Sequence, residues 1–434
     1  MLGEFIWSKQ RQIAESVRDN RRTAVQSCHE AGKSFVSSRI VSWWLETHEP
    51  GEAFVVTSAP TAPQVRAILW REIGRAHSRG KLAGRVNQTE WWIPVPGGRE
   101  EMVAFGRKPA DTDPTAFQGI HAKYVLVVFD EAVGIPRELW DAADSLIAND
   151  LSRFLAIGNP DDPQSEFASV CKPGSGWNTI KISAFDTPNL TGEAVPEALR
   201  HLLIGKTWIE EKRRKWGESN PLYLAKVLGE FPPVTDGGLI QPSWVSAAQL
   251  RTLEPGEPVE LGMDVGAGGD RSVVCERRGS VARILWDDGN PDTMQSCGRL
   301  IATLRETGAS LAKVDPLGVG KGVADRATEL GHPVYGVNVG EAAEDREAFE
   351  NRRAELYWNL RERFQDGDID IDPDDEDLAA QLLSLRFERS SRGRLKIESK
   401  IDMRKRGLSS PDRADALMLA FAKGYTGPAG SLFL

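Results

Sequence analysis

The sequence has few cysteines and no long apolar run, and these absences exclude several classes of protein. Its four cysteines are scattered over 434 residues without a C-x-x-C pair, which argues against a disulfide framework and against a zinc site. No apolar stretch approaches the ~20 residues that span a bilayer, so we expect no membrane association. The first residues, MLGEFIWSKQRQ, lack the basic start and apolar stretch of a secretory signal. We therefore expect reduced thiols in a cytoplasmic protein.

An excess of positive charge is also missing, because 63 Asp and Glu outnumber 54 Lys and Arg and leave a net charge of −9. Taken alone, this balance argues weakly against nucleic acid as a partner. The charge is unevenly distributed, however, since residues 386–406 carry nine Lys and Arg against three Asp and Glu, just after the acidic run DGDIDIDPDDED at 366–377. A DNA groove needs only local positive potential. Two interpretations stay open, a pair of solvated faces and a nucleic-acid surface.

Short apolar strands alternate with helical stretches over residues 23–185. The predicted strands are TAVQS, AFVVTSA, YVLVVFDEA, RFLAIGNP and NTIKISAF. Because continuous apolar runs are typical of strands buried on both faces, we expect a parallel sheet flanked by helices. A helical region is predicted over 194–229, and the pattern GEFPPVTDGGLIQPSW then interrupts regular structure.

The second half shows a different order of elements. Three short strands joined by tight turns, VELGMDVG, RSVVCERRG and VARILWDD, predict an antiparallel meander. Helices are expected at 293–307, 319–330, 342–365 and from Pro411 onward, with strands between them. This order is that of a ribonuclease-H-like fold. We predict an α/β protein with a parallel-sheet domain at 1–232, a linker at 233–256 and a ribonuclease-H-like domain at 257–434.

The stretch VQSCHEAGKS at 25–34 ends like a phosphate-binding loop, G-x-x-x-x-G-K-[ST], but has Ser27 at the first glycine position. Such a loop surrounds phosphates with backbone N–H groups and a helix N-terminus. Gly32 permits the turn, Lys33 supplies a positive charge, and Ser34 supplies a hydroxyl for Mg²⁺. A serine can replace the first glycine at modest conformational cost. The alternative is a chance GKS at the start of a helix.

Two acids at the end of a buried strand favour the nucleotide site. In YVLVVFDEA at 124–132, Asp130 and Glu131 are expected at the sheet edge that also holds the loop. Asp130 would hold Mg²⁺, and Glu131 would orient the water that attacks the γ-phosphate of ATP. The alternative is a strand leading into a helix capped by Asp. Asn159, after FLAIG, is placed to sense the γ-phosphate, and Gln10 with Trp7 to bind adenine.

Four acids in the second half suggest a metal site. Asp264 ends VELGMD, Asp315 ends LAKVD, and Asp412 begins a helix that carries Asp415 on the same face. Converging carboxylates repel one another unless cations neutralise them, and two Mg²⁺ about 4 Å apart suit phosphodiester hydrolysis. Two alternatives stay open: Asp264 and Asp412 as turn and helix caps, and Asp264 as part of an actin-type phosphate loop.

In this order, the motifs resemble those of the large terminase subunit of tailed bacteriophages, the DNA-packaging motor. The resemblance runs from about Trp7 to Lys423 and implies an additional-acid P-loop NTPase domain, with Walker A and Walker B motifs, followed by a ribonuclease-H-like nuclease domain. It rests on Trp7 with Gln10 and on SCHEAGKS, VVTSAPT, FQGIHA, VLVVFDEA, IGNP, LGEFP, GMDVGAGGD, VDPLGVGKGVAD and SPDRADAL.

The resemblance implies roles for these residues. Lys33 and Ser34 would bind phosphate and Mg²⁺, Asp130 the metal and Glu131 the water, while residues 158–160 would couple hydrolysis to DNA movement. The nuclease triad, which binds Mg²⁺ or Mn²⁺, matches Asp264, Asp315 and Asp412, with Asp415 as an accessory. The implied partners are double-stranded DNA, a small terminase subunit and a portal protein. A homo-oligomeric ring of these subunits would act in the host cytoplasm.

The predicted function is therefore ATP-driven translocation of double-stranded DNA into a procapsid, combined with two-metal endonuclease cleavage. One alternative is a DNA helicase or translocase whose second domain binds DNA without cleaving it. Another is a degenerate structural subunit, against which the intact Lys33, Glu131 and nuclease acids argue. The position of Cys28 inside the loop further predicts that thiol alkylation inhibits ATP hydrolysis and that ATP protects.

Overall fold

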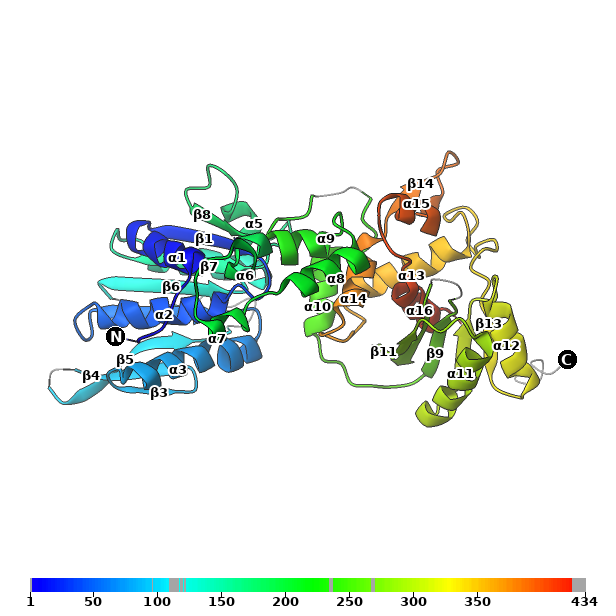
Figure 1. Ribbon diagram of the computed structural model, residues 1–434, viewed down its shortest axis with the longest axis horizontal. Helices are drawn as coiled ribbons and strands as arrows, with labels where there is room; N and C mark the ends of the chain where they lie inside the picture. Colours follow the sequence, from blue (N-terminus) through cyan, green and yellow to red (C-terminus); the bar gives the residue numbers. More distant parts are fainter. Residues whose placement is uncertain are drawn as a thin grey trace. The chain divides into compact units, whose positions relative to one another are not determined.

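The computed structural model describes residues 2–95, 97–108, 117, 120, 122–233, 237–266 and 270–423 (Figure 1). It forms two compact units, Met1–Arg214 with Pro221–Val234, and Lys215–Asn220 with Thr235–Leu434. Helix α10 (Pro242–Leu250) lies in the stretch expected as a linker and belongs to the second unit. Within the described residues, no helix has both the length and the apolar character needed to cross a bilayer.

The first unit is built on an eight-stranded sheet in the order β3-β4-β5-β2-β6-β7-β1-β8. Neighbouring strands are parallel from β5 to β8, and β4 pairs antiparallel with both β5 and β3 at one edge. The strands are β1 Arg22–Ser27, β2 Ala53–Ser58, β3 Arg85–Asn87, β4 Glu90–Val95, β5 Arg99–Gly106, β6 Tyr124–Asp130, β7 Arg153–Gly158 and β8 Asn178–Ile182.

The order of the central strands confirms an additional-acid type of P-loop fold. Strand β7 lies between β1, which precedes the loop, and β6, which ends in Asp130. Because these strands are parallel, their carboxyl ends meet at one edge of the sheet. The unit's helices are α1 Ser8–Asp19, α2 Lys33–Glu46, α3 Trp70–Gly80, α4 Arg137–Leu146, α5 Glu166–Val170, α6 Pro188–Thr191, α7 Glu197–Arg200, most of α8 Lys206–Trp216, and α9 Pro221–Tyr223, with π-helical turns at Gln64–Leu69 and Leu224–Leu228.

The central strands are anchored by an aromatic cluster behind the acidic edge. Phe129 meets Phe154 edge-on at 5.0 Å and Trp140 edge-on at 5.1 Å between ring centroids, and all three side chains are buried. Such pairs contribute about 0.5–1.5 kcal/mol each beyond the burial of apolar area. The cluster thus fixes the strand end that carries Asp130 and Glu131.

The second unit contains a five-stranded sheet in the order β11-β10-β9-β12-β13. The first three strands form the expected antiparallel meander, and β12 runs parallel to both β9 and β13. This topology confirms the ribonuclease-H-like prediction. The strands are β9 Val259–Asp264, β10 Ser272–Arg278, β11 Val281–Asp288, β12 Leu311–Val314 and β13 Val334–Gly336, with a separate hairpin of β14 Phe387–Arg389 and β15 Leu395–Ile397.

Helix α16 (Asp412–Phe421) packs directly on β9 and β10. A Cβ atom on Gly262 of β9 would lie 2.2 Å from the carbonyl oxygen of Ala416 and 2.2 Å from the nitrogen of Ala420. The missing side chain therefore lets the helix approach the strand that ends in Asp264. The unit's other helices are α10, α11 Thr293–Thr307, α12 Gly320–Glu329, α13 Arg352–Asp366, α14 Glu376–Ser384 and α15 Lys400–Lys405.

Several expected elements differ in extent. The helical region expected over 194–229 is divided into α7, α8, α9 and a π-helical turn, and the helix expected from residue 342 begins only at Arg352. Strands β3 to β5 were not anticipated, because they contain charged and partly exposed residues and do not resemble the continuously apolar central strands. Residues 424–434 lie outside the described residues, as do parts of the motifs FQGIHA and GMDVGAGGD.

Candidate functional site

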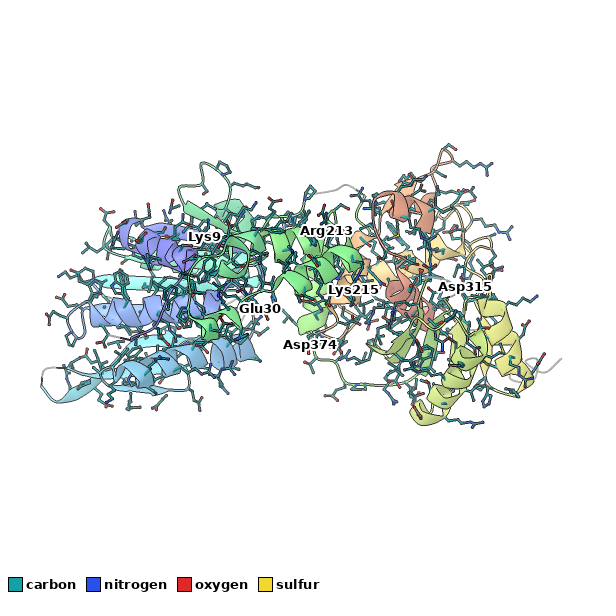
Figure 2. All side chains as sticks on the ribbon, viewed as in Figure 1. Lys9, Glu30, Arg213, Lys215, Asp315 and Asp374 are labelled. Carbon is teal, nitrogen blue, oxygen red and sulfur yellow. The ribbon has the colours of Figure 1, made fainter. Side chains whose placement is uncertain are left out.

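The phosphate loop connects the end of β1 to the start of α2. Its first part is fixed by backbone hydrogen bonds, since the N–H groups of Cys28 and His29 donate to Ile182 and Lys226 at 2.8 Å each. Glu30, labelled in Figure 2, and Gly32 both adopt left-handed backbone conformations. Among the described residues, none accepts a hydrogen bond from the N–H groups of residues 30–34. These five donors at a helix N-terminus form a suitable cradle for phosphate.

The predicted nucleotide residues converge beside this loop. Lys33 Nζ lies 3.1 Å from Asn159 Oδ1 and 3.8 Å from Glu131 Oε1, and its side chain is buried. Ser34 donates a hydrogen bond of 2.7 Å to Asp130 Oδ2. A hydroxyl and a carboxylate held this closely are suitable oxygen ligands for Mg²⁺. The structure therefore brings together the five residues expected from the loop and from the ends of β6 and β7.

Ser27, at the first position of the loop, and Gln10 of α1 both make hydrogen bonds that hold the loop. The carbonyl oxygen of Ser27 accepts a 2.7 Å hydrogen bond from the Asn159 amide, which links the loop to β7. Gln10 is buried and its amide donates to the carbonyl oxygens of Ala31 and Gly32 at 3.4 and 3.5 Å. Trp7 is also fully buried. A contact between Gln10 and adenine stays a prediction.

Two acids near the phosphate loop, Asp130 and Asp161, have raised pKa values. Burial, together with the charge of Glu131, raises the pKa of Asp130 to about 6. The same two causes raise the pKa of Asp161 to about 7, while Lys226 acts in the opposite direction. Sequence reasoning missed Asp161, which follows the GNP turn and has no motif of its own. Glu131 itself has a left-handed backbone with φ of 48°, a conformation that is uncommon for residues other than glycine.

The second candidate site lies where β9, β12 and α16 meet. Asp264 is the last residue of β9, Asp315 directly follows the neighbouring strand β12, and Asp412 and Asp415 occupy the first turn of α16. The side chains of Asp264, Asp412 and Asp415 are buried, and that of Asp315 is half-buried. The predicted acids thus stand on three adjacent elements of one unit.

Lys400 joins three of these acids and was not predicted. Its Nζ atom lies 2.8 Å from Asp415 Oδ2, 3.3 Å from Asp264 Oδ2 and 3.7 Å from Asp412 Oδ1. In the sequence Lys400 is one cation among nine in the basic segment 386–406, so no local signal distinguishes it. Only the position of α15 in the fold reveals that its ammonium group faces the acids.

Each acid has a distinct electrostatic environment. Burial raises the pKa of Asp264 to about 8, although Lys400 opposes the shift. Burial also disfavours ionisation of Asp415, but Lys400 and Arg353 outweigh it and its pKa is lowered. Asp415 Oδ1 additionally accepts a 2.5 Å hydrogen bond from the hydroxyl of Tyr357. One oxygen of Asp415 is therefore fixed while the other faces Lys400.

Asp412 and Asp315, the other two acids of the second site, each accept a hydrogen bond from a backbone N–H group. Asp412 Oδ2 accepts a 2.9 Å hydrogen bond from the backbone N–H of Arg271. Its Oδ1 is buried, accepts no hydrogen bond from the described residues and lies 3.7 Å from Lys400 Nζ. Asp315 Oδ1 accepts from the N–H of Leu317 at 3.1 Å, and burial raises the pKa of this acid, with smaller effects from Asp415 and Lys400.

The acids of the second site offer oxygens that suit divalent cations, and Lys400 lies among them. A buried Asp412 oxygen that accepts no hydrogen bond, together with carboxylates from adjacent elements, is the kind of donor set that Mg²⁺ and Mn²⁺ prefer. Within the described residues, however, no three His, Cys, Asp or Glu side chains already converge as a metal-binding group. The ammonium group of Lys400 lies among the carboxylates instead. The donor set fits a metal that shares this space with Lys400.

Comparison with known proteins agrees with the resemblance drawn from the motifs. The chain is similar to a protein described as "Probable terminase, large subunit" of Enterobacteria phage P7, with 25% identity over 457 residues, covering 96% of this chain and 88% of that one. This relative confirms the resemblance to large terminase subunits. No protein-family model matches the chain.

Two solved structures show more distant similarity. One is the large terminase of a thermophilic bacteriophage in complex with ADP, with 14% identity, 96% of this chain and 100% of that chain covered, and a TM-score of 0.45. The other is the nuclease domain of the large terminase subunit of bacterial virus Sf6, with 24% identity, 43% of this chain and 100% of that chain covered, and a TM-score of 0.38.

Proposed function

We propose that this chain is the motor and nuclease subunit of a viral DNA-packaging machine. It hydrolyses ATP to translocate double-stranded DNA into a procapsid and cuts DNA with a two-metal site. The observation that carries the proposal is that one chain holds two separate phosphate-directed sites. The first combines a phosphate loop with Asp130 and Glu131, and the second gathers Asp264, Asp412 and Asp415 around Lys400.

In the first unit, the chain binds the phosphates and places the attacking water. The N–H groups of residues 30–34 and the ammonium group of Lys33 bind phosphate oxygens, and Ser34 with Asp130 holds Mg²⁺. The ion neutralises phosphate charge when bound. Glu131 accepts a hydrogen bond from the attacking water and aligns it. Asn159, which contacts both Lys33 and the Ser27 carbonyl, links the state of the phosphate to β7.

In the second unit, the acids hold the metal and the protein orients the acids. Mg²⁺ or Mn²⁺ supplies an activated water and stabilises the leaving oxygen when bound. Asp264, Asp315 and Asp412 supply the ligand oxygens, and Asp415 is an accessory ligand. Tyr357 and Arg353 hold Asp415 Oδ1, and the Arg271 N–H holds Asp412 Oδ2. The other oxygens, Asp415 Oδ2 and Asp412 Oδ1, lie beside Lys400 Nζ.

The proposed function includes partners and a division of the chain. DNA and the packaging machinery are the general partners, and we assign a small terminase subunit, a portal protein and a ring of identical subunits in the host cytoplasm. We assign residues 1–232 to the ATPase, 233–256 to a linker and 257–434 to the nuclease. The division into two compact units near residue 234 supports two domains, although α10 within the assigned linker belongs to the second unit. A helicase or translocase that does not cut is less favoured, because a domain that only binds DNA does not need buried acids around one cation.

A two-by-two experiment tests the proposal on the purified full chain. ATP hydrolysis, and plasmid cleavage with Mg²⁺ or Mn²⁺, are measured for Lys33→Ala and Asp264→Ala. Lys33→Ala is expected to abolish hydrolysis and retain metal-dependent cleavage, and Asp264→Ala is expected to do the reverse. Cleavage by Asp264→Ala at the wild-type rate would show that the nuclease site is wrongly placed. Hydrolysis by Lys33→Ala at the wild-type rate would remove the ATPase assignment.

A further inference from the structure

The helix that carries two of the nuclease acids begins without a cap of its own. Its N-cap residue is Pro411, whose side chain accepts no hydrogen bond, although the first N–H groups of any helix need acceptors. Gln381 of α14 supplies one instead: its Oε1 accepts from the backbone N–H of Arg413 at 2.8 Å and of Ala414 at 3.1 Å. The position of the first turn of α16 therefore depends on α14.

The side chain of Arg413 adds two further contacts between α16 and its neighbours. Its guanidinium group donates to Asp375 Oδ2 at 2.7 Å, at the N-cap of α14, and to Asp287 Oδ2 at 2.9 Å, near the end of strand β11. All three side chains are at most 20% exposed, so the pairing is largely protected from water. A planar guanidinium bound to two carboxylates fixes both angle and distance.

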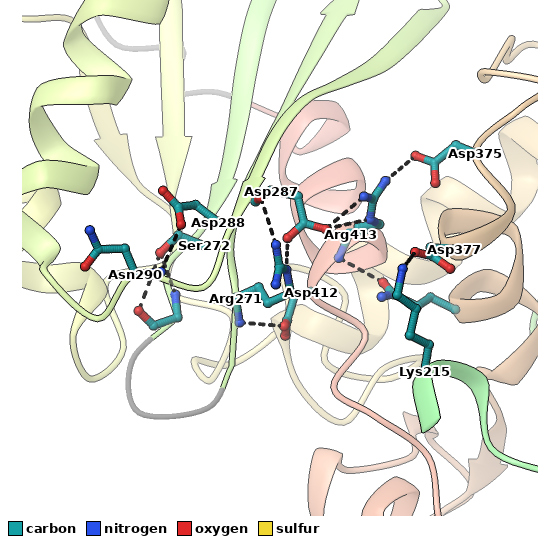
Figure 3. A network of polar contacts seen from close by, with 12 residues as sticks. Lys215, Arg271, Ser272, Asp287, Asp288, Asn290, Asp375, Asp377, Asp412 and Arg413 are labelled. Atoms are coloured by element: carbon teal, nitrogen blue, oxygen red, sulfur yellow. Dashed lines mark hydrogen bonds and ion pairs between the residues drawn. The ribbon is translucent and has the colours of Figure 1, made fainter. Parts of the chain in front are cut away.

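The Asp287 carboxylate leads back to the metal site. Arg271 donates through its side chain to Asp287 Oδ1 and to the Asp287 carbonyl oxygen, the latter at 2.9 Å. The backbone N–H of the same Arg271 donates to Asp412 Oδ2 at 2.9 Å. Figure 3 shows the resulting circuit, in which Asp412, Arg271, Asp287 and Arg413 form a closed ring that starts and ends on consecutive residues of α16.

We propose that Arg413 is a positioning residue of the nuclease site. It touches none of the predicted metal ligands with its side chain, but through Asp287 and Arg271 it fixes the carboxylate of Asp412 in one rotation. Asp412 Oδ2 is committed to the Arg271 N–H, and Oδ1 is left for the cation. The inference rests on the proposed nuclease function and deepens it, because it names what orients one of the acids.

The test compares Arg413→Gln with wild type in plasmid cleavage over a range of Mn²⁺ concentrations. Groups that orient metal ligands typically contribute about 10–100-fold to metal affinity. The Mn²⁺ concentration for half-maximal cleavage is therefore expected to rise on the order of tenfold, with the rate at saturating Mn²⁺ much less affected. ATP hydrolysis reports that the other unit is folded, and the cleavage rate at saturating Mn²⁺ reports that the unit carrying Arg413 is folded. Arg413→Lys retains the charge but cannot contact Asp287 and Asp375 at the same time. Its Mn²⁺ concentration for half-maximal cleavage is expected to lie between those of wild type and Arg413→Gln.

Arg406→Gln is the matched control. Arg406 has a similarly buried side chain and an ion pair with Glu398 in the same unit, but it does not belong to the ring around Asp412. It should lower the melting temperature without moving the Mn²⁺ dependence. A loss of metal affinity equal to that of Arg413→Gln would mean that destabilisation alone explains the effect, and would overturn the inference.

The remaining outcomes separate the inference from the function on which it rests. Wild-type Mn²⁺ dependence in Arg413→Gln, with Asp264→Ala inactive, overturns the positioning role and leaves the nuclease assignment intact. Cleavage by Asp264→Ala overturns the nuclease site itself. If Arg413→Gln does not cleave even at saturating Mn²⁺ because its unit does not fold, Arg413→Lys and Asp287→Asn are judged by the same shift in Mn²⁺ dependence.

Discussion

Lys400 holds its ammonium nitrogen 2.8 Å from Oδ2 of Asp415, and the same nitrogen lies within 3.7 Å of Asp264 and Asp412. The three acids raise the pKa of Lys400 against the opposing effect of burial, so the side chain stays charged. One positive charge thus offsets repulsion among whichever of these acids are ionised. A divalent cation that binds these oxygens has to compete with this ammonium group.

Lys400→Ala should therefore lower the folding stability of the metal-free protein and increase the stabilisation that Mg²⁺ provides. We expect a loss of stability of about 1–3 kcal/mol, below the full cost of breaking a buried pair, because a third of the Lys400 side chain is exposed. The increase in melting temperature with Mg²⁺ should exceed that of wild type. Lys405→Ala, on the same helix but paired with exposed Asp402, is the control. Equal metal responses in wild type and Lys400→Ala would contradict competition.

The raised pKa of Asp264 predicts that metal binding depends on pH. Its folded-state pKa is about 8 against an ordinary value of 3.8, so the metal-free protein keeps this proton until about pH 8. Stability from this group is complete below about pH 4 and is lost as the pH rises through about 8. The increase in melting temperature with Mg²⁺ should be small near about pH 6 and large near about pH 8.5. Asp264→Asn should remove most of this dependence, whereas a pH-independent metal response in wild type would contradict it.

The residues of the nucleotide site were largely predictable from the sequence, whereas those of the acidic site in the second unit were predictable only in part. The phosphate loop and Asp130 follow carboxyl ends of parallel strands, which always meet at one edge, so local patterns place them together. Asp264 and Asp315 follow the same rule. Lys400 and Tyr357 reach the acids from elements distant in sequence, which a pattern of residue types does not encode. A helix was expected from residue 342, but α13 begins only at Arg352, after the N-cap Asn351. The helical pattern of the sequence did not by itself identify Asn351 as the N-cap.

Gly32 should be intolerant of a side chain for two separable reasons. Its φ of 77° disfavours any other residue by about 1–2 kcal/mol, and a Cβ atom would lie 2.5 Å from the Gln10 amide nitrogen. Gly32→Ala should therefore be less destabilising in a Gln10→Ala background than in wild type, as measured by urea unfolding. Gly174→Ala reports the backbone effect alone, because Gly174 has φ of 82° and no atom within 4 Å of its Cβ position. Identical losses in both backgrounds would rule out the contact.

Glu131→Gln should separate nucleotide binding from hydrolysis. The amide keeps the shape of the side chain but loses the charge that aligns and polarises water, so we expect hydrolysis to fall about 10²–10⁴-fold. Binding of a fluorescent ATP analogue should change little, because the loop and Lys33 remain. Glu30→Gln is the matched control, since Glu30 shares the φ of 48° but is exposed on the loop. Comparable loss of hydrolysis in both variants would argue against a specific role for Glu131.

The structure alters the prediction made for Cys28. Alkylation was expected to block ATP hydrolysis, but the side chain is fully buried and burial raises the pKa of its thiol to about 12 from 9.0. Because the thiolate is the reactive form, this shift lowers its fraction at neutral pH about a thousandfold. Cys28 in the native protein should therefore resist iodoacetamide for hours with full ATPase activity retained, and should react promptly in denaturant. Peptide mass spectrometry measures the modification.

Added ATP distinguishes a protected thiol from one exposed by loop opening. If Cys28 is inert because it is buried, ATP changes its modification rate little, since no reactive form is available to protect. Cys28→Ser controls for modification at Cys171, Cys275 and Cys297, the other free thiols. Rapid alkylation of native Cys28 with parallel loss of hydrolysis, slowed by ATP, would restore the sequence-based prediction. It would mean that the loop opens far enough to break the Cys28 hydrogen bond to Ile182.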